Sequence, residues 1–175
     1  MERNDLVMVD IFDNELGLVN KADAHKDPIL HRAFSVFLIN KSGEMLIQKR
    51  AAHKYHSPNL WANACCSHPR AGEDVVKSAE KRLTEELGFT TKVEEIFKFT
   101  YLNKFNDNLF EYELDHVLIG RYDGEVVLNP EEASEFKWIS LEQLSEDLVK
   151  NPKNYSSWFI IAAPKVIEFL QLTNN

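Results

Sequence analysis

The stretch EDVVKSAEKRLTEELGF, residues 73 to 89, decides the fold of this 175-residue chain. Its apolar residues recur every three or four positions, which predicts an amphipathic helix. Gly88 follows the last apolar residue of the repeat, where a helix most readily ends. Strand patterns lie before and after this helix, so the chain combines helices with a sheet. The residues of the repeat are Val75, Val76, Ala79, Leu83 and Leu87.

Two hairpins are expected before the helix. DLVMVDIFD and ELGLVN alternate polar and apolar residues around Asp13 and Asn14, which predicts a first hairpin there. HRAFSVFLIN and EMLIQKR are rich in β-branched and aromatic residues and flank a short turn that contains Gly43. Glycine takes the positive φ that such turns require, so these two segments form the second expected hairpin.

After the helix come two long strand patterns, EEIFKFTYLNKF and LFEYELDHVLIGRY. An Asp-Gly turn at Gly124 is expected to lead into a further strand, EVVLN. Ser140 and Gln143 form a capping-box pattern at the start of a helix, LEQLSEDLVK. The tail SSWFIIAAPKVIEFLQL predicts a last apolar helix that is interrupted near Pro164. The chain is therefore expected to be a single α/β or α+β domain over residues 1–175, with a mixed sheet flanked by helices.

The composition narrows the classes of function. With 44% hydrophobic and 27% charged residues, the chain is typical of a globular protein. A net charge of −8 argues against general nucleic-acid binding, although a local group of Lys and Arg can still bind an anion. No stretch approaches the roughly 18 apolar residues of a membrane span. With only two cysteines the chain is not a disulfide scaffold, so we expect a reduced, cytoplasmic protein.

Both cysteines lie side by side in WANACCSHPRAGE, residues 61–73. A disulfide between neighbours would need a strained ring, and a zinc clamp would favour C-x₂-C spacing. In an extended segment Cys66 and His68 share one face while Cys65 points to the other. Cys65 is expected to pack as a small buried hydrophobe. For Cys66 a buried thiol and a reactive thiol stay equally open.

Three histidines suggest a cluster, since His25 and His31 bracket HKDPILH at the entry to a strand and His68 follows the cysteines. The other three have no converging partner in the sequence, and a lone histidine is more often a structural or surface residue than a ligand. They are His53, His56 and His116.

Three carboxylates on one strand have two interpretations. In EYELD the period of two places Glu111, Glu113 and Asp115 on one face. This can be a solvated face, which is the more common case for an isolated strand. Alternatively, a cation relieves the repulsion between the like charges. Imidazole and carboxylate ligands together suit Mg²⁺ or a first-row divalent ion.

The helix quoted above also carries a family signature. With the residues before it, the helix resembles the Nudix signature G-x₅-E-x₇-R-E-U-x-E-E-x-G-U, where U is bulky and apolar. Ser67 replaces the first Gly, Lys81 replaces the Arg, and Arg82 replaces the Glu that helps to hold metal in Nudix hydrolases. Arginine cannot ligate a cation, but it suits a phosphate oxygen. The matching residues are Glu73, Leu83, Glu85, Glu86, Gly88 and Phe89.

NACCSHP, the altered helix, AHKDPILHRAFSVF and FEYELDHVL together resemble the type 1 isopentenyl-diphosphate Δ-isomerases, from about Lys21 to Trp158. The resemblance implies a Nudix-type mixed β-sheet sandwiched between helices. It also implies the interconversion of isopentenyl and dimethylallyl diphosphate, a step of isoprenoid biosynthesis. The reaction is a 1,3 proton shift on an alkene, with a tertiary carbocation as the intermediate.

By this resemblance Cys66 and Glu113 are catalytic, Tyr101 assists protonation, and Trp158 lies over the hydrocarbon end. A thiol beside cationic groups is easily deprotonated and can carry a proton. An indole face stabilises a transient cation by ~0.5–2 kcal/mol. Without the resemblance, Trp158 would be taken as a core anchor of the last helix.

The resemblance also implies two ions and a small-molecule diphosphate substrate. We expect no nucleic-acid or membrane partner and a monomeric chain. Mg²⁺ would accompany the diphosphate, held by Glu86 and the backbone of Cys66. A second divalent ion (Mn²⁺, Mg²⁺ or Zn²⁺) would occupy a site formed by His25, His31, His68, Glu111 and Glu113. The diphosphate would be gripped by Lys21, Arg50, Lys54 and Arg82, with Ser67 as a backbone donor.

Two other functions compete with the isomerase. A Nudix pyrophosphohydrolase is disfavoured because Arg82 replaces the hydrolytic Glu. A non-catalytic metal-binding module predicts that loss of the Cys66 thiol has no measurable effect.

Overall fold

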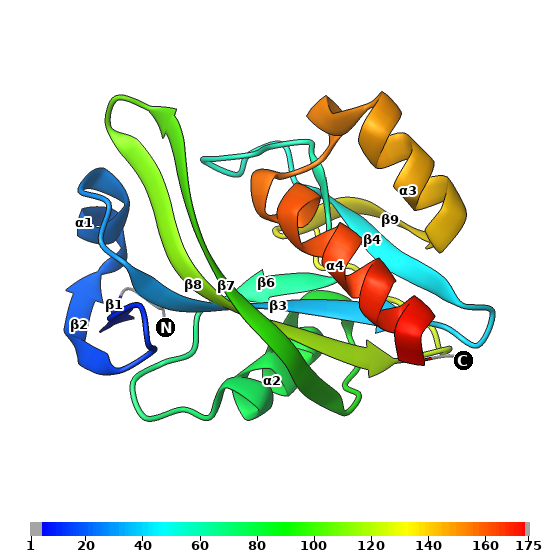
Figure 1. Ribbon diagram of the computed structural model, residues 1–175, viewed down its shortest axis with the longest axis horizontal. Coiled ribbons are helices and arrows are strands. Elements are labelled where there is room, and N and C mark those ends of the chain that lie inside the picture. The colour runs from blue at the N-terminus through cyan, green and yellow to red at the C-terminus, as the bar shows by residue number, and fades with distance from the viewer. Residues whose placement is uncertain (1–4, 174–175) are drawn as a thin grey trace.

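The computed structural model describes residues 5–173, which form a nine-stranded sheet with four α-helices around it (Figure 1). The strands are β1 (Asp5–Val9), β2 (Glu15–Asn20), β3 (His31–Ile39), β4 (Glu44–Arg50), β5 (Trp61–Ala62), β6 (Cys65–Ser67), β7 (Val93–Asn106), β8 (Leu109–Arg121) and β9 (Ala133–Ser140). The helices are α1 (Lys21–Lys26), α2 (Val75–Leu87), α3 (Leu141–Lys150), the 3₁₀ turn Pro152–Asn154 and α4 (Ser157–Thr173).

Strand β3 is the centre of the sheet. It pairs antiparallel with β1, β4 and β6, and parallel with β8. On one side β8 pairs with β7 in a long hairpin. On the other side β4 pairs antiparallel with β5 and with β9. The parallel register places His31 opposite Glu113 and Ile39 opposite Arg121. This one pairing joins an early segment of the chain to a late one.

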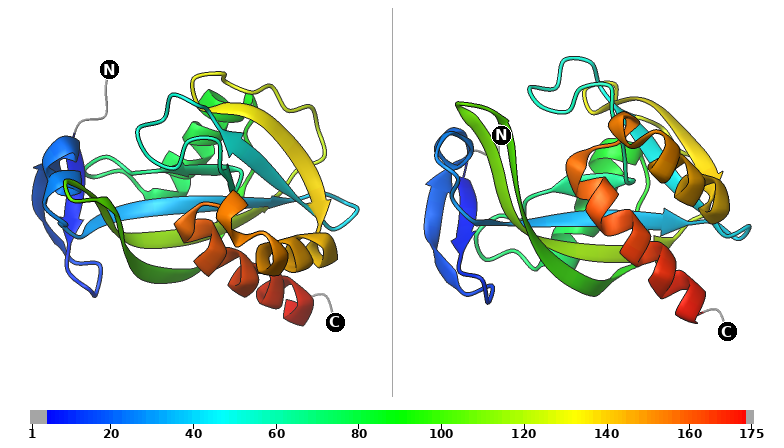
Figure 2. Two further views of the ribbon diagram at one scale, coloured as in Figure 1. Left: turned by 90° about the horizontal axis from the view of Figure 1, so that it is seen from above. Right: turned by 45° about the horizontal axis from the view of Figure 1, so that its top comes forward.

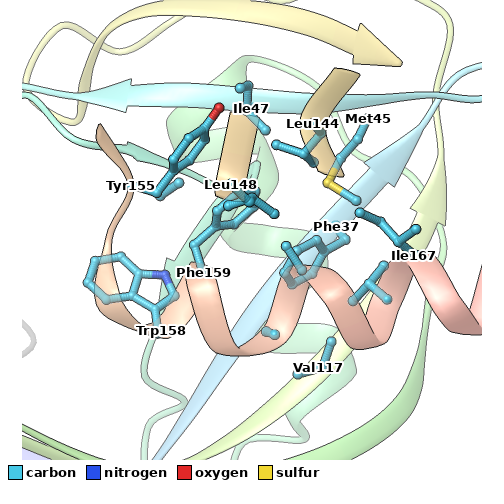
Figure 3. Packing of buried hydrophobic residues seen from close by; sticks show 14 of the residues in the cluster. Phe37, Met45, Ile47, Val117, Leu144, Leu148, Tyr155, Trp158, Phe159 and Ile167 are labelled. Carbon is cyan, nitrogen blue, oxygen red and sulfur yellow. The ribbon is translucent and has the colours of Figure 1, made fainter. Parts of the chain in front are cut away.

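Helices cover both faces of the sheet, as Figures 1 and 2 show, with α2 on one side and α3 and α4 on the other. Alternate residues of β3 supply the two cores, because successive side chains of a strand point to opposite faces. Phe34, Val36 and Leu38 pack with α2. Phe37 packs with α4, where its ring stacks on that of Phe159 at 5.9 Å between centroids (Figure 3). The expected mixed sheet between helices is confirmed.

The expected helix around residues 73–89 is confirmed as α2, and Gly88 ends it with a φ of 76°. The expected strand EVVLN is wrong. This segment instead runs back along the end of α2, where Val127 N–H donates to Leu87 O at 3.0 Å and Asn129 N–H donates to Glu86 O at 2.9 Å. The last carbonyls of a helix lack partners within it, so the segment bonds to a helix end rather than to the sheet.

Both early hairpins and the cap of α3 are confirmed. β1 pairs with β2 across the turn that contains Asp13, and β3 meets β4 across the turn that contains Gly43. Ser140 is the N-cap of α3, where its Oγ accepts a hydrogen bond from Gln143 N at 3.2 Å.

The expected interruption of the last helix at Pro164 is wrong, because α4 is continuous over Ser157–Thr173. Pro164 lies on the exposed side of the helix. Ala163, Val166 and Ile167 are buried on the other side and hold both halves against the sheet. This packing outweighs the one backbone hydrogen bond that proline removes. Among the helices of residues 5–173, none has the length and apolar composition that crossing a membrane requires.

Candidate active site

A cavity of about 160 Å³ lies over the start of β3 and β8, on the face of the sheet that α4 covers. Segment 51–60, between β4 and β5, contributes part of its wall. The cavity brings together most of the residues that the sequence singled out, although they come from distant parts of the chain. Its lining consists of Lys21, Phe34, Ser35, Arg50, Lys54, Tyr55, His56, Cys66, Ser67, His68, Arg82, Tyr101, Glu111, Glu113, Glu132 and Trp158.

Four side chains beside this cavity form a candidate metal centre. His25, His31, His68 and Glu113 each offer one ligand atom, and these atoms lie within 4.8 Å of one another. The backbone explains why they meet. His31 opens β3, Glu113 is its partner in the parallel register, and His68 directly follows β6, which also pairs with β3. His25 comes from the short helix α1.

The imidazoles are oriented for a cation. His31 Nδ1 lies 2.8 Å from Ile29 O, to which it donates, so Nε2 carries the lone pair on the cluster side. Glu113 Oε1 lies 3.5 Å from that Nε2. Within the described chain, His25 Nε2 and His31 Nε2 are buried without a hydrogen-bond partner. Such unpartnered nitrogens are uncommon in a folded protein and fit a divalent ion.

The protonation states also suit a metal. Burial lowers the pKa of His25 to about 3, and the neighbouring His68 and His31 add to this effect. Burial likewise lowers the pKa of His68. Burial opposes the charge of Glu113, but the nearby imidazoles of His31 and His68 outweigh burial and hold the pKa of Glu113 well below the usual range. Neutral imidazoles and an ionised carboxylate are the forms that ligate a cation.

The expected fifth ligand, Glu111, lies outside this group of four. It lines the cavity, with His56 Nε2 at 3.7 Å from its Oε1. Burial, and then the charge of Glu113, raises the pKa of Glu111 well above its usual range. The alternative of a solvated carboxylate face is wrong, because Glu111, Glu113 and Asp115 are only 5%, 5% and 1% exposed. A cation would relieve this crowding of buried acids.

The two cysteines divide as expected. Cys65 is fully buried among the apolar residues under α2, whereas Cys66 faces the cavity. The Cys66 thiol donates to Asn63 Oδ1 at 3.0 Å. Burial raises the pKa of Cys66, and the nearby Asp115 raises it further, which outweighs the influence of Arg50. Burial in this arrangement therefore favours the protonated thiol, in contrast to the easily deprotonated thiol that was expected.

Tyr101 and Trp158 complete the walls around the thiol. Tyr101 is the antiparallel partner of Glu113, and its hydroxyl donates to Glu113 Oε2 at 2.7 Å. Trp158 Nε1 donates to Asn63 Oδ1 at 3.1 Å, the same oxygen that accepts from Cys66. Trp158, in the first turn of α4, also belongs to the hydrophobic core (Figure 3), so it is both a core anchor and a wall of the cavity.

Cationic side chains form another part of the lining. The expected grip residues all reach the cavity, and Arg50 lies 5.1 Å from the ring centre of Trp158. Arg82 and Lys54 both pair with Glu132, Arg82 at 2.8 Å through Nη2. Glu86 lies behind Arg82, at 2.8 Å from its Nε, and is not a lining residue. Burial raises the pKa of Glu86 to about 7.

Several residues of the site were missed by the sequence analysis. The sequence predicts a structural or surface role for His56, but it lies in the cavity with its ring nearly perpendicular to that of Trp158, at 6.0 Å between centroids. Tyr55 and Glu132 also line the cavity. Segment 51–60 has no helical or strand period, so no pattern gives the direction of its side chains. Asn63 lies within the quoted NACCSHP run, where its adjacency to the cysteines was the available signal.

Comparison with known proteins is consistent with this geometry. A family model described as the NUDIX domain matches residues 29–159. The chain is 43% identical over 162 residues to "Isopentenyl-diphosphate Delta-isomerase 2" of Aromatoleum aromaticum, covering 93% of this chain and 86% of that protein. It is 47% identical over 154 residues to "Isopentenyl-diphosphate Delta-isomerase 2" of Photorhabdus laumondii, covering 88% and 87%.

Solved structures support the fold alone, since their identities are low. DR0079 from Deinococcus radiodurans has a TM-score of 0.75 at 20% identity and covers 92% of this chain and 98% of its own. A MutT protein from Methanosarcina mazei has a TM-score of 0.65 at 18% identity, covering 83% and 96%. The sheet and its covering helices are thus shared well beyond the relatives of similar sequence.

Proposed function

This chain belongs to the Nudix family and, within it, to the isopentenyl-diphosphate Δ-isomerases, and from this we propose that it interconverts isopentenyl and dimethylallyl diphosphate. One observation carries the proposal beyond the likeness of sequence. A single small cavity joins a cationic wall to two proton-carrying groups beneath an indole ring. The cationic wall suits a diphosphate, and the proton-carrying groups suit an allylic proton shift. The indole ring suits a developing carbocation.

The diphosphate is bound by the cationic wall. Charge-assisted hydrogen bonds from Arg and Lys suit phosphate oxygens, and the arginine fork can hold two of them at once. Ser67 offers its backbone N–H beside them. Arg82 fills the place of the hydrolytic Glu and is held by three carboxylates, those of Glu85, Glu86 and Glu132. The replacement of the hydrolytic Glu by Arg82 favours binding of the substrate over its hydrolysis. The other residues of the grip are Lys21, Arg50 and Lys54.

Two ions are part of the proposal. A divalent ion, Mn²⁺, Mg²⁺ or Zn²⁺, would be held by His25, His31, His68 and Glu113, with Glu111 as the fifth ligand. The unpartnered histidine nitrogens and the crowded carboxylates support this assignment. Glu86, which lies behind Arg82, and the backbone of Cys66 would hold Mg²⁺ at the diphosphate. When bound, these ions neutralise negative charge and fix the positions of the carboxylates and the diphosphate.

The protein moves protons at two places. One place is the pair formed by Tyr101 and Glu113, whose Oη and Oε2 lie 2.7 Å apart. The other place is the thiol of Cys66. In the forward direction one group adds a proton to the terminal alkene carbon, and the other accepts a proton from the carbon next to C–O. The sum is a 1,3 shift with no net change in protons. Positioned acid–base groups of this kind contribute typically ~10²–10⁴-fold to a rate.

Trp158 protects the charged intermediate. Its ring closes the cavity and presents a π-face, which stabilises a transient cation by ~0.5–2 kcal/mol and keeps water away from it. We also assign the chain as a cytoplasmic monomer with one domain over residues 1–175 and a small-molecule substrate. Both cysteines are unpaired, which is compatible with a reducing compartment.

The test is isotope exchange. The full chain with Mg²⁺ is incubated with isopentenyl diphosphate in D₂O, and NMR follows deuterium in the methyl and allylic positions. Deuterium is expected at both, together with dimethylallyl diphosphate. No incorporation with the metal sites filled would refute the isomerase. Release of phosphate or of a nucleoside monophosphate from nucleotide substrates would instead identify a hydrolase.

A further inference from the structure

Tyr55 contacts the metal centre from outside the ligand set. It belongs to segment 51–60, and its hydroxyl lies 2.7 Å from His25 Nδ1. His25 is 4% exposed, while Tyr55 is 53% exposed. The hydroxyl is the only polar group of the Tyr55 side chain, and it bonds to a buried imidazole. This contact is the feature that the proposed function leaves unexplained.

The hydrogen bond at Nδ1 decides what His25 Nε2 can do. When Nδ1 carries the proton and donates it to the Tyr55 hydroxyl, Nε2 keeps its lone pair. That Nε2 is buried and without a hydrogen-bond partner in the described chain, and it lies in the candidate metal cluster. His31 shows the same arrangement, with Ile29 O on its outer nitrogen. Two of the three histidines are therefore held from behind, one by backbone and one by Tyr55.

The ring of Tyr55 is itself held in place. Lys21 Nζ lies 5.7 Å from its centre, and the His56 ring packs edge-on at 4.6 Å between centroids. Tyr55 and Lys21 both line the active-site cavity and a second cavity of about 540 Å³, which His25 also reaches. Tyr55 is thus a fixed wall between the substrate cavity and the outer side of the metal centre.

We propose that Tyr55 is a positioning residue of the metal centre, whose hydroxyl sets the tautomer and ring orientation of His25. The inference rests on the proposed function only in that the cluster holds a divalent ion. Hydrogen-bond partners behind ligating histidines typically change metal affinity by ~10–100-fold. Tyr55 follows Lys54 directly, so one short segment supplies both a cation of the diphosphate grip and the support of a metal ligand.

The test measures metal affinity without substrate. The full chain is stripped of metal and titrated with Co²⁺, whose binding is followed by its visible absorption and by competition with a chelator. Tyr55→Phe keeps the ring and removes the hydroxyl, and we expect it to weaken Co²⁺ binding by ~10–100-fold. Tyr122→Phe is the matched control, because its hydroxyl donates to Glu125 O at 2.7 Å outside the cavity. Its Co²⁺ affinity is expected to equal that of the wild type.

A double-mutant cycle separates positioning from general damage to the fold. If Tyr55 acts through His25, adding Tyr55→Phe to His25→Ala has no further effect on Co²⁺ affinity. Wild-type affinity in Tyr55→Phe, or an equal loss in both backgrounds, overturns the inference. The isomerase is judged separately by deuterium uptake. A wild type that binds Co²⁺ but takes up no deuterium refutes only the proposed function. A wild type that takes up deuterium with an empty cluster refutes the inference and the ion assigned to that cluster, while the isomerase activity itself stands.

Discussion

At the scale of single residues, Asn63 connects two catalytic candidates, Cys66 and Trp158, that lie far apart in the sequence. Its Oδ1 accepts from the Cys66 thiol and from the Trp158 indole, and its amide group donates to Val36 O at 3.0 Å and Cys65 O at 2.8 Å. Asn63 is fully buried, so these bonds have no competition from solvent. The backbone of β3 therefore sets the position of thiol and indole through one carboxamide.

Cys66→Ala tests the thiol directly. Because the change removes a proton-carrying group and little volume, we expect kcat to fall by ~10²–10⁴-fold while the protein stays folded and binds metal. Steady-state kinetics and thermal unfolding measure the two effects. Cys65→Ala is the matched control. Its loss of buried packing is expected to lower the free energy of unfolding by ~0.5–3 kcal/mol without changing turnover. Undiminished turnover in Cys66→Ala would exclude a catalytic thiol.

At the scale of elements, the end of α2 is held by residues 125–129, the segment that was expected to form a strand. Gly88 has a positive φ, and a Cβ there would lie 3.1 Å from Val127 Cβ. The close approach allows Val127 N–H to bond to the last carbonyl of the helix. Turn chemistry at Gly124 was visible in the sequence, but this docking was not. Whether an extended segment joins a sheet or a helix end depends on partners far away in the chain.

Gly88→Ala is expected to destabilise the protein by more than the ~1–2 kcal/mol that a side chain at positive φ costs, because the new methyl group also meets Val127. The free energy of unfolding in urea measures the loss. Gly43→Ala separates the two causes, since Gly43 has a φ of 77° and a Cβ there meets nothing within 4 Å. Equal losses in the two variants would show that the contact with Val127 is unimportant.

Much of the site follows from strand period alone. The period of two correctly grouped Glu111, Glu113 and Asp115, and it separated Cys65 from Cys66. What no pattern gives is the parallel pairing of β3 with β8, which brings the carboxylates to the histidines. The segment that carries Tyr55 and His56 has no period at all, and Pro164 misled because tertiary packing overrides a local preference. The roles of the site residues stay predictions until the experiments above are done.

At the scale of the whole molecule, Glu132 joins three distant segments through Lys54 and Arg82, and this predicts a dependence on pH. Burial opposes its charge, but both partners outweigh burial and lower its pKa below the ordinary 4.5. Its contribution to stability is thus fully present above about pH 4.5 and is lost as pH falls through the folded pKa. The Tm of the wild type should exceed that of Glu132→Gln at pH 6, and the gap should close toward pH 3. A gap that stays constant over this range would contradict the assignment.

The parallel pairing of β3 with β8 also orders events during synthesis. His25, His31 and His68 are synthesised well before Glu113. Strand β3 therefore lacks its parallel neighbour until β8 has emerged from the ribosome. Long-range pairing of this kind forms late, because the intervening loop must close first. A nascent chain therefore carries the three histidines without their carboxylate partner until β8 has been made. The four candidate ligands can therefore meet only after β8 has joined β3.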